Sequence, residues 1–181
     1  MAKIILISGH AQNGKDTTAT FMQEYLESKG QHVQIMHYAD ELKFICKSYF
    51  GWDGFKDDAG RHILQYVGTD VVRSKVPDFW VNRLMDMLKV FWKEWDYVII
   101  PDTRFPNEVI HPKSITNDCW HVRVERPNFT SPLTAEQQQH PSETALDCPG
   151  IHEPDYTIIN AGTLDDLRVA TIEVLRRITK K

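Results

Sequence analysis

A loop framed by two glycines constrains this chain more than any other stretch. It covers Gly9–Thr17 and reads Gly-His-Ala-Gln-Asn-Gly-Lys-Asp-Thr. Four aliphatic residues precede it and predict a buried strand over residues 3–8, while the residues after it predict a helix that ends near Lys29 and is capped at Gly30. The pattern Gly-x-x-x-x-Gly-Lys between a strand and a helix predicts a loop that binds phosphate.

Physical reasons support this interpretation of the loop. Gly9 and Gly14 let the backbone turn sharply, so that successive N–H groups can point at one phosphate. The N-terminus of the following helix adds a partial positive charge. Lys15 supplies a mobile positive charge for a phosphate group.

One residue departs from the usual form of the loop. The position after the lysine is normally Ser or Thr, whose hydroxyl ligates Mg²⁺. Here it is Asp16, followed by Thr17. A carboxylate is also a hard oxygen ligand for Mg²⁺, directly or through a water. We therefore expect Asp16, with Thr17 nearby, to take the metal-binding role.

Strands and helices are predicted to alternate along the rest of the chain. Further strands are expected over residues 32–38, 97–100, 120–125 and 156–159, and helices over 39–50, with Asp40 as N-cap, and over 61–73, interrupted at Gly68. Two more helices are expected to begin at Pro77 and at the capping box of Thr163. The alternation predicts one α/β domain over residues 1–181, with a parallel sheet and right-handed crossovers.

Apolar residues at helical spacing predict the buried faces of the last two helices. For the first of these helices they are Trp80, Leu84, Met87, Leu88, Phe91 and Trp95. For the C-terminal helix they are Leu164, Leu167, Thr171, Val174, Leu175 and Ile178.

Charged residues follow several of the predicted strands, where ligands of a parallel sheet gather. They are Asp40, Asp102, Arg104 and Arg126. Asp102 directly follows an apolar run, as does the acidic residue that helps to hold Mg²⁺ in phosphate-loop enzymes. Planar, bidentate arginines suit the charge that spreads over a phosphoryl group during transfer.

Composition limits the classes of function. A net charge of −4 over 181 residues disfavours a general nucleic-acid binder, so an anionic ligand must be held by local arginines. No apolar run is long enough for a membrane span or a signal peptide. Three cysteines at unrelated spacings predict reduced thiols in a cytosolic protein. The set Cys119, His121, Cys148 and His152 matches no usual zinc knuckle.

Residues 126–150 are polar and rich in Pro, Gln, Ser and Thr. An irregular segment of this length in a compact domain is usually a functional lid or is disordered. We interpret it as a lid.

Several short motifs, in their order along the chain, resemble the deoxynucleoside monophosphate kinase family of phage and bacterial type. The resemblance covers nearly the whole chain, and the lysine–aspartate pair of the loop is itself typical of that family. The motifs are Gly9–Thr17, Tyr38–Lys43, Leu64–Arg73, Phe79–Val81, Asp102–Glu108, His140–Leu146 and Ile159–Leu164.

The resemblance implies a three-layer α/β phosphate-loop kinase fold and transfer of the γ-phosphate of ATP to a deoxynucleoside monophosphate. Mg²⁺ would be served by Asp16, Thr17 and Asp102. The catalytic residues would be Lys15, Arg73, Arg104 and Arg126, with Arg126 leading into the lid. The ATP phosphates would be held by Gly9, Gln12, Asn13, Gly14, Lys15, Asp16, Thr17 and Thr18.

The same resemblance places the acceptor nucleotide near residues 40–95. Arg73 would bind its phosphate and Gln65 would lie near its base, while Tyr38 or Trp80 is bulky enough to exclude a 2′-hydroxyl. The full set of acceptor-side candidates is Tyr38, Asp40, Lys43, Gln65, Thr69, Arg73, Trp80 and Arg104. The preferred base and the discrimination between deoxyribose and ribose stay open.

Two alternatives remain at this point. The Gly-Lys-Asp loop is also similar to that of the animal-type phosphomevalonate kinases, whose acceptor is likewise a phosphate, although the segment from Gln65 to Arg73 favours a nucleotide. The second alternative is a non-catalytic nucleotide-binding protein.

A cytoplasmic location and small-molecule partners are expected. A homodimer is consistent with the family and with aromatic residues beyond those needed for the core, such as Trp92 and Trp95.

Overall fold

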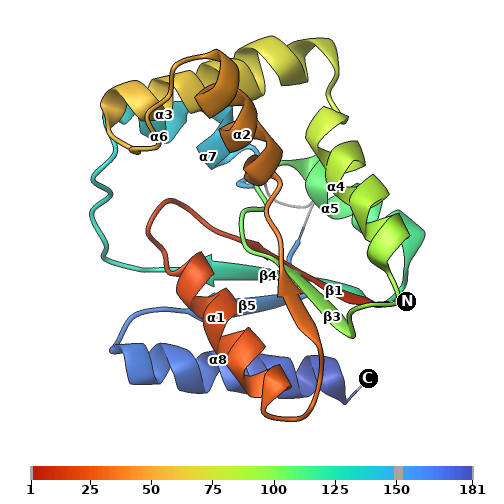
Figure 1. The fold of residues 1–181 in the computed structure, drawn as a ribbon. Helices are drawn as coiled ribbons and strands as arrows, with labels where there is room; N and C mark the ends of the chain where they lie inside the picture. The colour runs from red at the N-terminus through yellow and green to blue at the C-terminus, as the bar shows by residue number, and fades with distance from the viewer. Residues whose placement is uncertain (1, 149–152, 181) are drawn as a thin grey trace. The chain divides into compact units, whose positions relative to one another are not determined.

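The computed structural model describes residues 2–148 and 153–180 (Figure 1). These residues fall into two compact units. One unit contains the residues up to Met36 together with those from Phe91 onward, and the other contains His37–Val90. The second range nearly coincides with the stretch expected to hold the acceptor.

The first unit is built on a five-stranded parallel sheet with the order β2-β3-β1-β4-β5. Its strands are β1 (Lys3–Ser8), β2 (Val33–Ile35), β3 (Tyr97–Ile100), β4 (Cys119–Glu125) and β5 (Tyr156–Ile159). The predicted parallel α/β sheet is confirmed, and only β2 is markedly shorter than expected. The phosphate loop follows the central strand β1, which pairs with both β3 and β4.

Three helices cover the two faces of this sheet: α1 (Lys15–Glu27), α5 (Pro106–Ile115) and α8 (Leu164–Thr179). Two short helices of the same unit, α6 (Ala135–Gln139) and α7 (Pro141–Thr144), lie in the segment between β4 and β5. In Figure 1, α1 and α8 run side by side along one face, and α5 lies on the other side of the strands. Met22 and Leu175 pack in one core with Ile5 and Ile99, while the alternate strand residues, such as Leu6, are equally buried.

The C-terminal helix shows where the sequence-based prediction was right and where it was wrong. Thr163 accepts a hydrogen bond from the Asp166 N–H, which confirms the predicted capping box. The apolar stripe from Leu167 to Ile178 is buried as expected. Leu164, however, is 67% exposed, because residues 161–166 all face solvent and the first helical turn lies outside the core.

The second unit consists of helices: α2 (Ala39–Tyr49), α3 (Asp58–Gln65), the π-helix η1 (Tyr66–Arg73) and α4 (Phe79–Phe91). Asp40 is not the N-cap of α2, because the helix already includes Ala39 and the cap position is Tyr38. The Asp40 carboxylate instead accepts a hydrogen bond from Lys43 at 2.9 Å. On α4, Met87 and Phe91 are exposed and not buried as predicted, because the core-facing stripe runs through Val81 and Met85 instead.

The predicted interruption at Gly68 is also wrong. The helical run begins earlier than expected, at Asp58, where Asp57 accepts a hydrogen bond from the Gly60 N–H at 2.8 Å. It then passes through Gly68 by widening into η1. A Cβ at Gly68 would lie 2.7 Å from Leu42 Cδ2, so a larger residue there would require the Leu42 side chain to shift.

Two features were not predicted. Helix α5 starts at Pro106 and contains Pro112, and its prolines masked its helical pattern. The segment 126–150 contains the short helices α6 and α7.

Among the described residues, no helix has the length and apolarity needed to cross a membrane.

Candidate active site

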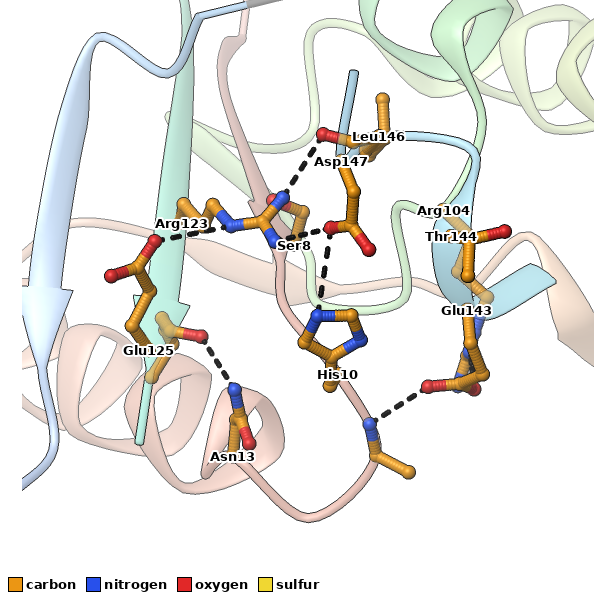
Figure 2. A network of polar contacts seen from close by, with 12 residues as sticks. Ser8, His10, Asn13, Arg104, Arg123, Glu125, Glu143, Thr144, Leu146 and Asp147 are labelled. Atoms are coloured by element: carbon orange, nitrogen blue, oxygen red, sulfur yellow. Dashed lines mark hydrogen bonds and ion pairs between the residues drawn. The ribbon is translucent and has the colours of Figure 1, made fainter. Parts of the chain in front are cut away.

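The first half of the phosphate loop lies directly against strand β4. Gly9 has φ 141°, and a Cβ at this position would lie 2.3 Å from the Val124 carbonyl oxygen. Only glycine can make this approach. The Asn13 amide donates to the same carbonyl at 3.2 Å, as Figure 2 shows. The loop is therefore held by β4 and not only by its own turns.

The second half of the loop is held from the end of β5. The Asn160 Nδ2 donates to the Asn13 carbonyl at 3.0 Å. Gly14 has φ 100°, and a Cβ there would lie 2.8 Å from the Asn160 Nδ2. Gln12 also adopts a left-handed conformation, with φ 62°. Asn160 lies in one of the family motifs, but nothing in the sequence indicates that it supports the loop.

Lys15 is the most perturbed charge of the site. It begins α1 and is only 8% exposed, and its Nζ donates to the His10 carbonyl at 2.8 Å. Burial, followed by the positive charge of Arg104, lowers the pKa of Lys15 to about 8. A site that disfavours its own positive charge in this way is suited to an incoming anion.

The residues that follow Lys15 differ in their access to a ligand. Asp16 is exposed and Thr17 is half-buried. Thr18 is fully buried, and its N–H donates to the Gly14 carbonyl at 2.8 Å. Asp16 and Thr17 are therefore presented at the surface of the loop, whereas the Thr18 side chain is not.

The turn after β3 brings Asp102 and Arg104 to the loop. The Thr103 N–H donates to the Ile7 carbonyl at 3.2 Å, which ties this turn to β1. Glu108 is 2% exposed, and its Oε2 accepts hydrogen bonds from the N–H groups of Arg104 at 2.7 Å and Phe105 at 3.0 Å. The sequence-based prediction missed this supporting carboxylate, although a Glu three residues into a helix is a recognisable capping signal.

The carboxylates near the loop fit a magnesium ion. The charges of Asp16 and Asp102 both act on Lys15 and raise its pKa, so both lie near the phosphate loop. The described part of the chain contains no cluster of three or more metal-ligating side chains. One or two carboxylates, completed by phosphate oxygens and water, are the usual protein contribution to a Mg²⁺ site.

Segment 126–150 contacts the loop at its beginning. Arg126 donates to the Gln12 carbonyl at 3.3 Å, and its guanidinium lies 4.2 Å above the Phe129 ring. The predicted end of the lid at Gly150 lies outside the described residues.

The segment also contacts the loop through α7 (Figure 2). The Glu143 Oε2 accepts a hydrogen bond from the Ala11 N–H at 2.9 Å, and its Oε1 is paired with the Arg104 Nη1. The same nitrogen donates to the Ser142 carbonyl at 2.7 Å. No role was predicted for Glu143 from the sequence.

A second set of contacts lies just beyond α7. Arg123, near the end of β4, donates to the Leu146 carbonyl at 3.1 Å and is paired with the Asp147 carboxylate. The same carboxylate also lies 3.5 Å from the Nε2 of the loop residue His10. Glu143 therefore contacts the phosphate loop at a backbone N–H, and Asp147 contacts it at the His10 side chain.

Most candidates for the acceptor side lie in the second unit. Gln65, Thr69 and Arg73 are each half-buried and follow one another at intervals of four; Gln65 is the last residue of α3, and the other two lie on η1. Residues four apart are neighbours on a helix surface. Arg73 donates to the Pro77 carbonyl at 3.3 Å. Trp80 is 3% exposed and donates to the Gly68 carbonyl at 2.9 Å, so it also braces η1. Tyr38 is buried as well.

The cysteines and histidines weighed as a zinc set have other surroundings. Cys119 is buried, which raises its pKa to about 12. His121 is buried, and its Nε2 lies 2.7 Å from the Ser8 Oγ. Cys148 is exposed, and His152 lies outside the described residues.

Solved structures share the fold. The APS kinase of Mycobacterium tuberculosis, in complex with AMPPNP and APS, matches over 97% of this chain and 98% of its own, with 13% identity and a TM-score of 0.52. The shikimate kinase of Aquifex aeolicus matches over 98% of both chains, with 13% identity and a TM-score of 0.51. The fold is therefore the α/β phosphate-loop kinase fold expected from the sequence.

Related sequences carry one common name. A protein of Acanthamoeba polyphaga mimivirus, provisionally named a deoxynucleotide monophosphate kinase, is 25% identical over 90% of this chain and 91% of its own length. The deoxynucleotide monophosphate kinase of Enterobacteria phage T4 is 28% identical over 59% of this chain and 41% of its own length. The model of the deoxynucleotide monophosphate kinase family matches residues 30–171. The chain therefore belongs to the deoxynucleotide monophosphate kinase family and is a nucleotide kinase.

Proposed function

We propose that this chain transfers the γ-phosphoryl group of ATP to the phosphate of a deoxynucleoside monophosphate, with Mg²⁺ bound to the nucleotide. The observation that carries the proposal is the surroundings of Lys15. This buried lysine stands at the start of α1, with its pKa lowered to about 8 by burial and by Arg104. Bringing a polyanion to this place would relieve the repulsion between the two cations.

Positioning and neutralisation of charge suffice for the reaction. The phosphate of the acceptor is already largely ionised near pH 7, so no general base is required. The loop N–H groups and Lys15 would hold the transferring phosphate, and Arg104 would neutralise the charge that develops on it. A magnesium ion held by Asp16, Thr17 and Asp102 would supply further charge neutralisation.

The acceptor is proposed to bind along the face of η1. Arg73 would take its phosphate and Gln65 would lie near its base, with Thr69 between them. Tyr38, Asp40, Lys43 and Trp80 complete the proposed acceptor side, with Trp80 acting through its support of Gly68. A π-helix is a costly local geometry that often marks a functional stretch, which supports this placement.

Segment 126–150 is proposed to close over ATP, because a kinase that admits water would hydrolyse its own donor. Its contacts to Gln12 and Ala11 show that it already reaches the loop. Hydrogen exchange of this segment should slow when ATP and the acceptor bind together. An unchanged exchange rate would remove the lid assignment.

The deciding experiment is a panel of all common nucleoside and deoxynucleoside monophosphates with ATP and Mg²⁺, comparing kcat/KM. We expect turnover with one or more deoxynucleotides. Turnover with phosphomevalonate in their place would establish the neighbouring class of small-molecule kinase. Binding of Mg-ATP without turnover of any acceptor would establish a nucleotide-binding protein without catalysis.

The metal role of Asp16 has a separate test. Asp16→Asn removes the charge of one carboxylate of the proposed site and should raise the Mg²⁺ concentration needed for half-maximal activity by about tenfold. Asp165→Asn, which makes the same change at an exposed position on α8, is the matched control and should leave the Mg²⁺ dependence unchanged. If the two variants had the same Mg²⁺ dependence and turnover, Asp16 would have no metal role.

A further inference from the structure

A buried carboxylate lies on the backbone of the phosphate loop. The Glu143 side chain is 7% exposed, and its Oε2 accepts the Ala11 N–H at 2.9 Å. Ala11 belongs to the loop whose N–H groups are expected to hold phosphate oxygens. A side-chain oxygen from 132 residues away therefore accepts a hydrogen bond from one of these donors.

The cations around Glu143 are those assigned to the transferring phosphate. Its Oε1 is paired with the Arg104 Nη1. Its charge also raises the pKa of Lys15, and this effect is larger than those of Asp16 or Asp102. One loop N–H and the Arg104 guanidinium thus meet a single carboxylate, with the Lys15 charge nearby, which is the arrangement that would receive a phosphoryl group.

A carboxylate and a phosphate cannot both occupy such a place. Each carries negative charge, each needs the same N–H and the same guanidinium, and two like charges in a buried site repel each other strongly. If a nucleotide phosphate reaches Ala11 and Arg104, the Glu143 carboxylate must leave them.

We propose that Glu143 is a resident anion of the phosphate loop, which fills the place of a nucleotide phosphate in the empty protein and must be displaced when ATP binds. This inference rests on the proposed function. Displacement also separates Arg104 from its carboxylate partner. Nucleotide binding at the loop therefore frees the Arg104 guanidinium for the transferring phosphate.

The place of Glu143 in the chain suits this exchange. It lies on α7, a helix of four residues, and Arg123 holds Leu146 and Asp147, which follow shortly after this helix. The segment can therefore shift at α7 while its anchor at β4 holds. Neutralisation of Lys15 and Arg104 by Glu143 also lessens the repulsion between these two cations when no nucleotide is bound.

The test is direct binding of inorganic tripolyphosphate, which carries no base or sugar, measured by isothermal titration calorimetry on the whole chain. Glu143→Gln keeps the size of the side chain and removes its charge. If the Glu143 carboxylate occupies the loop about nine-tenths of the time, loss of its charge should tighten tripolyphosphate binding by about tenfold. Glu143→Asp keeps the charge but shortens the reach to Ala11, and it should also bind more tightly than the unmodified chain.

Glu94→Gln is the matched control, since it removes the charge of an exposed glutamate before β3 and should bind as the unmodified chain does. Circular dichroism of each variant checks that it is folded. Equal or weaker binding by both Glu143 variants would overturn the inference and make Glu143 a brace for Arg104. If neither the unmodified chain nor any variant bound tripolyphosphate, this inference and the phosphate-binding role of the loop would both be refuted. A nucleotide panel without turnover would refute only the proposed reaction.

Discussion

Lys15 offers the sharpest test of the electrostatics of the site. Its pKa falls from 10.5 to about 8, chiefly because the ammonium is buried. A shift of about two and a half units, at about 1.36 kcal/mol per unit, corresponds to about 3 kcal/mol of lost stability when Lys15 is charged. Lys15→Met removes this cost together with a hydrogen bond to His10 worth about 1 kcal/mol. The variant should therefore be more stable than the unmodified chain by about 2 kcal/mol at pH 7.

The dependence on pH follows from the direction of the shift. Below pH 8 the lysine is charged in both the folded and the unfolded chain, so the full cost is present. Between pH 8 and pH 10.5 the unfolded chain binds the proton that the folded chain has released, and this contribution to stability rises with pH. The advantage of Lys15→Met should therefore shrink steadily across that window.

The assay is urea unfolding of both chains at a series of pH values from 7 to 10, followed by tryptophan fluorescence. Lys93→Met, at an exposed position before β3, is the control and should change stability little at any pH. Lys15→Met should also lose phosphoryl transfer, so that its stability rises while its activity falls. A Lys15→Met chain that is less stable at pH 7, or whose advantage stays constant with pH, would refute the reasoning.

Two further predictions concern the backbone around the loop. Gly9→Ala would press a Cβ against the Val124 carbonyl, and it should destabilise the fold by at least about 2 kcal/mol in thermal unfolding and abolish nucleotide binding. Gly54→Ala, also at positive φ but with open space around it, is the control and should cost only about 1 kcal/mol of stability. Glu108→Gln weakens two hydrogen bonds to backbone N–H groups after β3 and should cost about 1–3 kcal/mol of stability and lower kcat/KM; unchanged kcat/KM would show that this carboxylate does not position the turn.

Local patterns predicted the framework of the sheet unit correctly. The strand before the loop, the glycines and the lysine are neighbours in the chain, so the sequence alone identified the loop, although β4 and Asn160 hold it in place. The apolar run at 97–100 is buried on both faces and forms an interior strand of the sheet, between β2 and β1. Predictions failed where two local rules conflicted, as in α5, where prolines masked a helix, and at Gly68, where a wide helical turn accommodates a glycine.

The sequence alone predicted a phosphate loop, and where it lies along the chain, because such a loop is built from neighbouring residues. Only the tertiary structure decided which distant groups complete the site. Asn160 supports the loop from the end of β5, and Glu143 reaches Ala11 from α7. Each of these contacts is made by a single polar side chain, and no repeating apolar pattern in the sequence marks its position. Its partner is set by the order of the strands and the path of the connections between them.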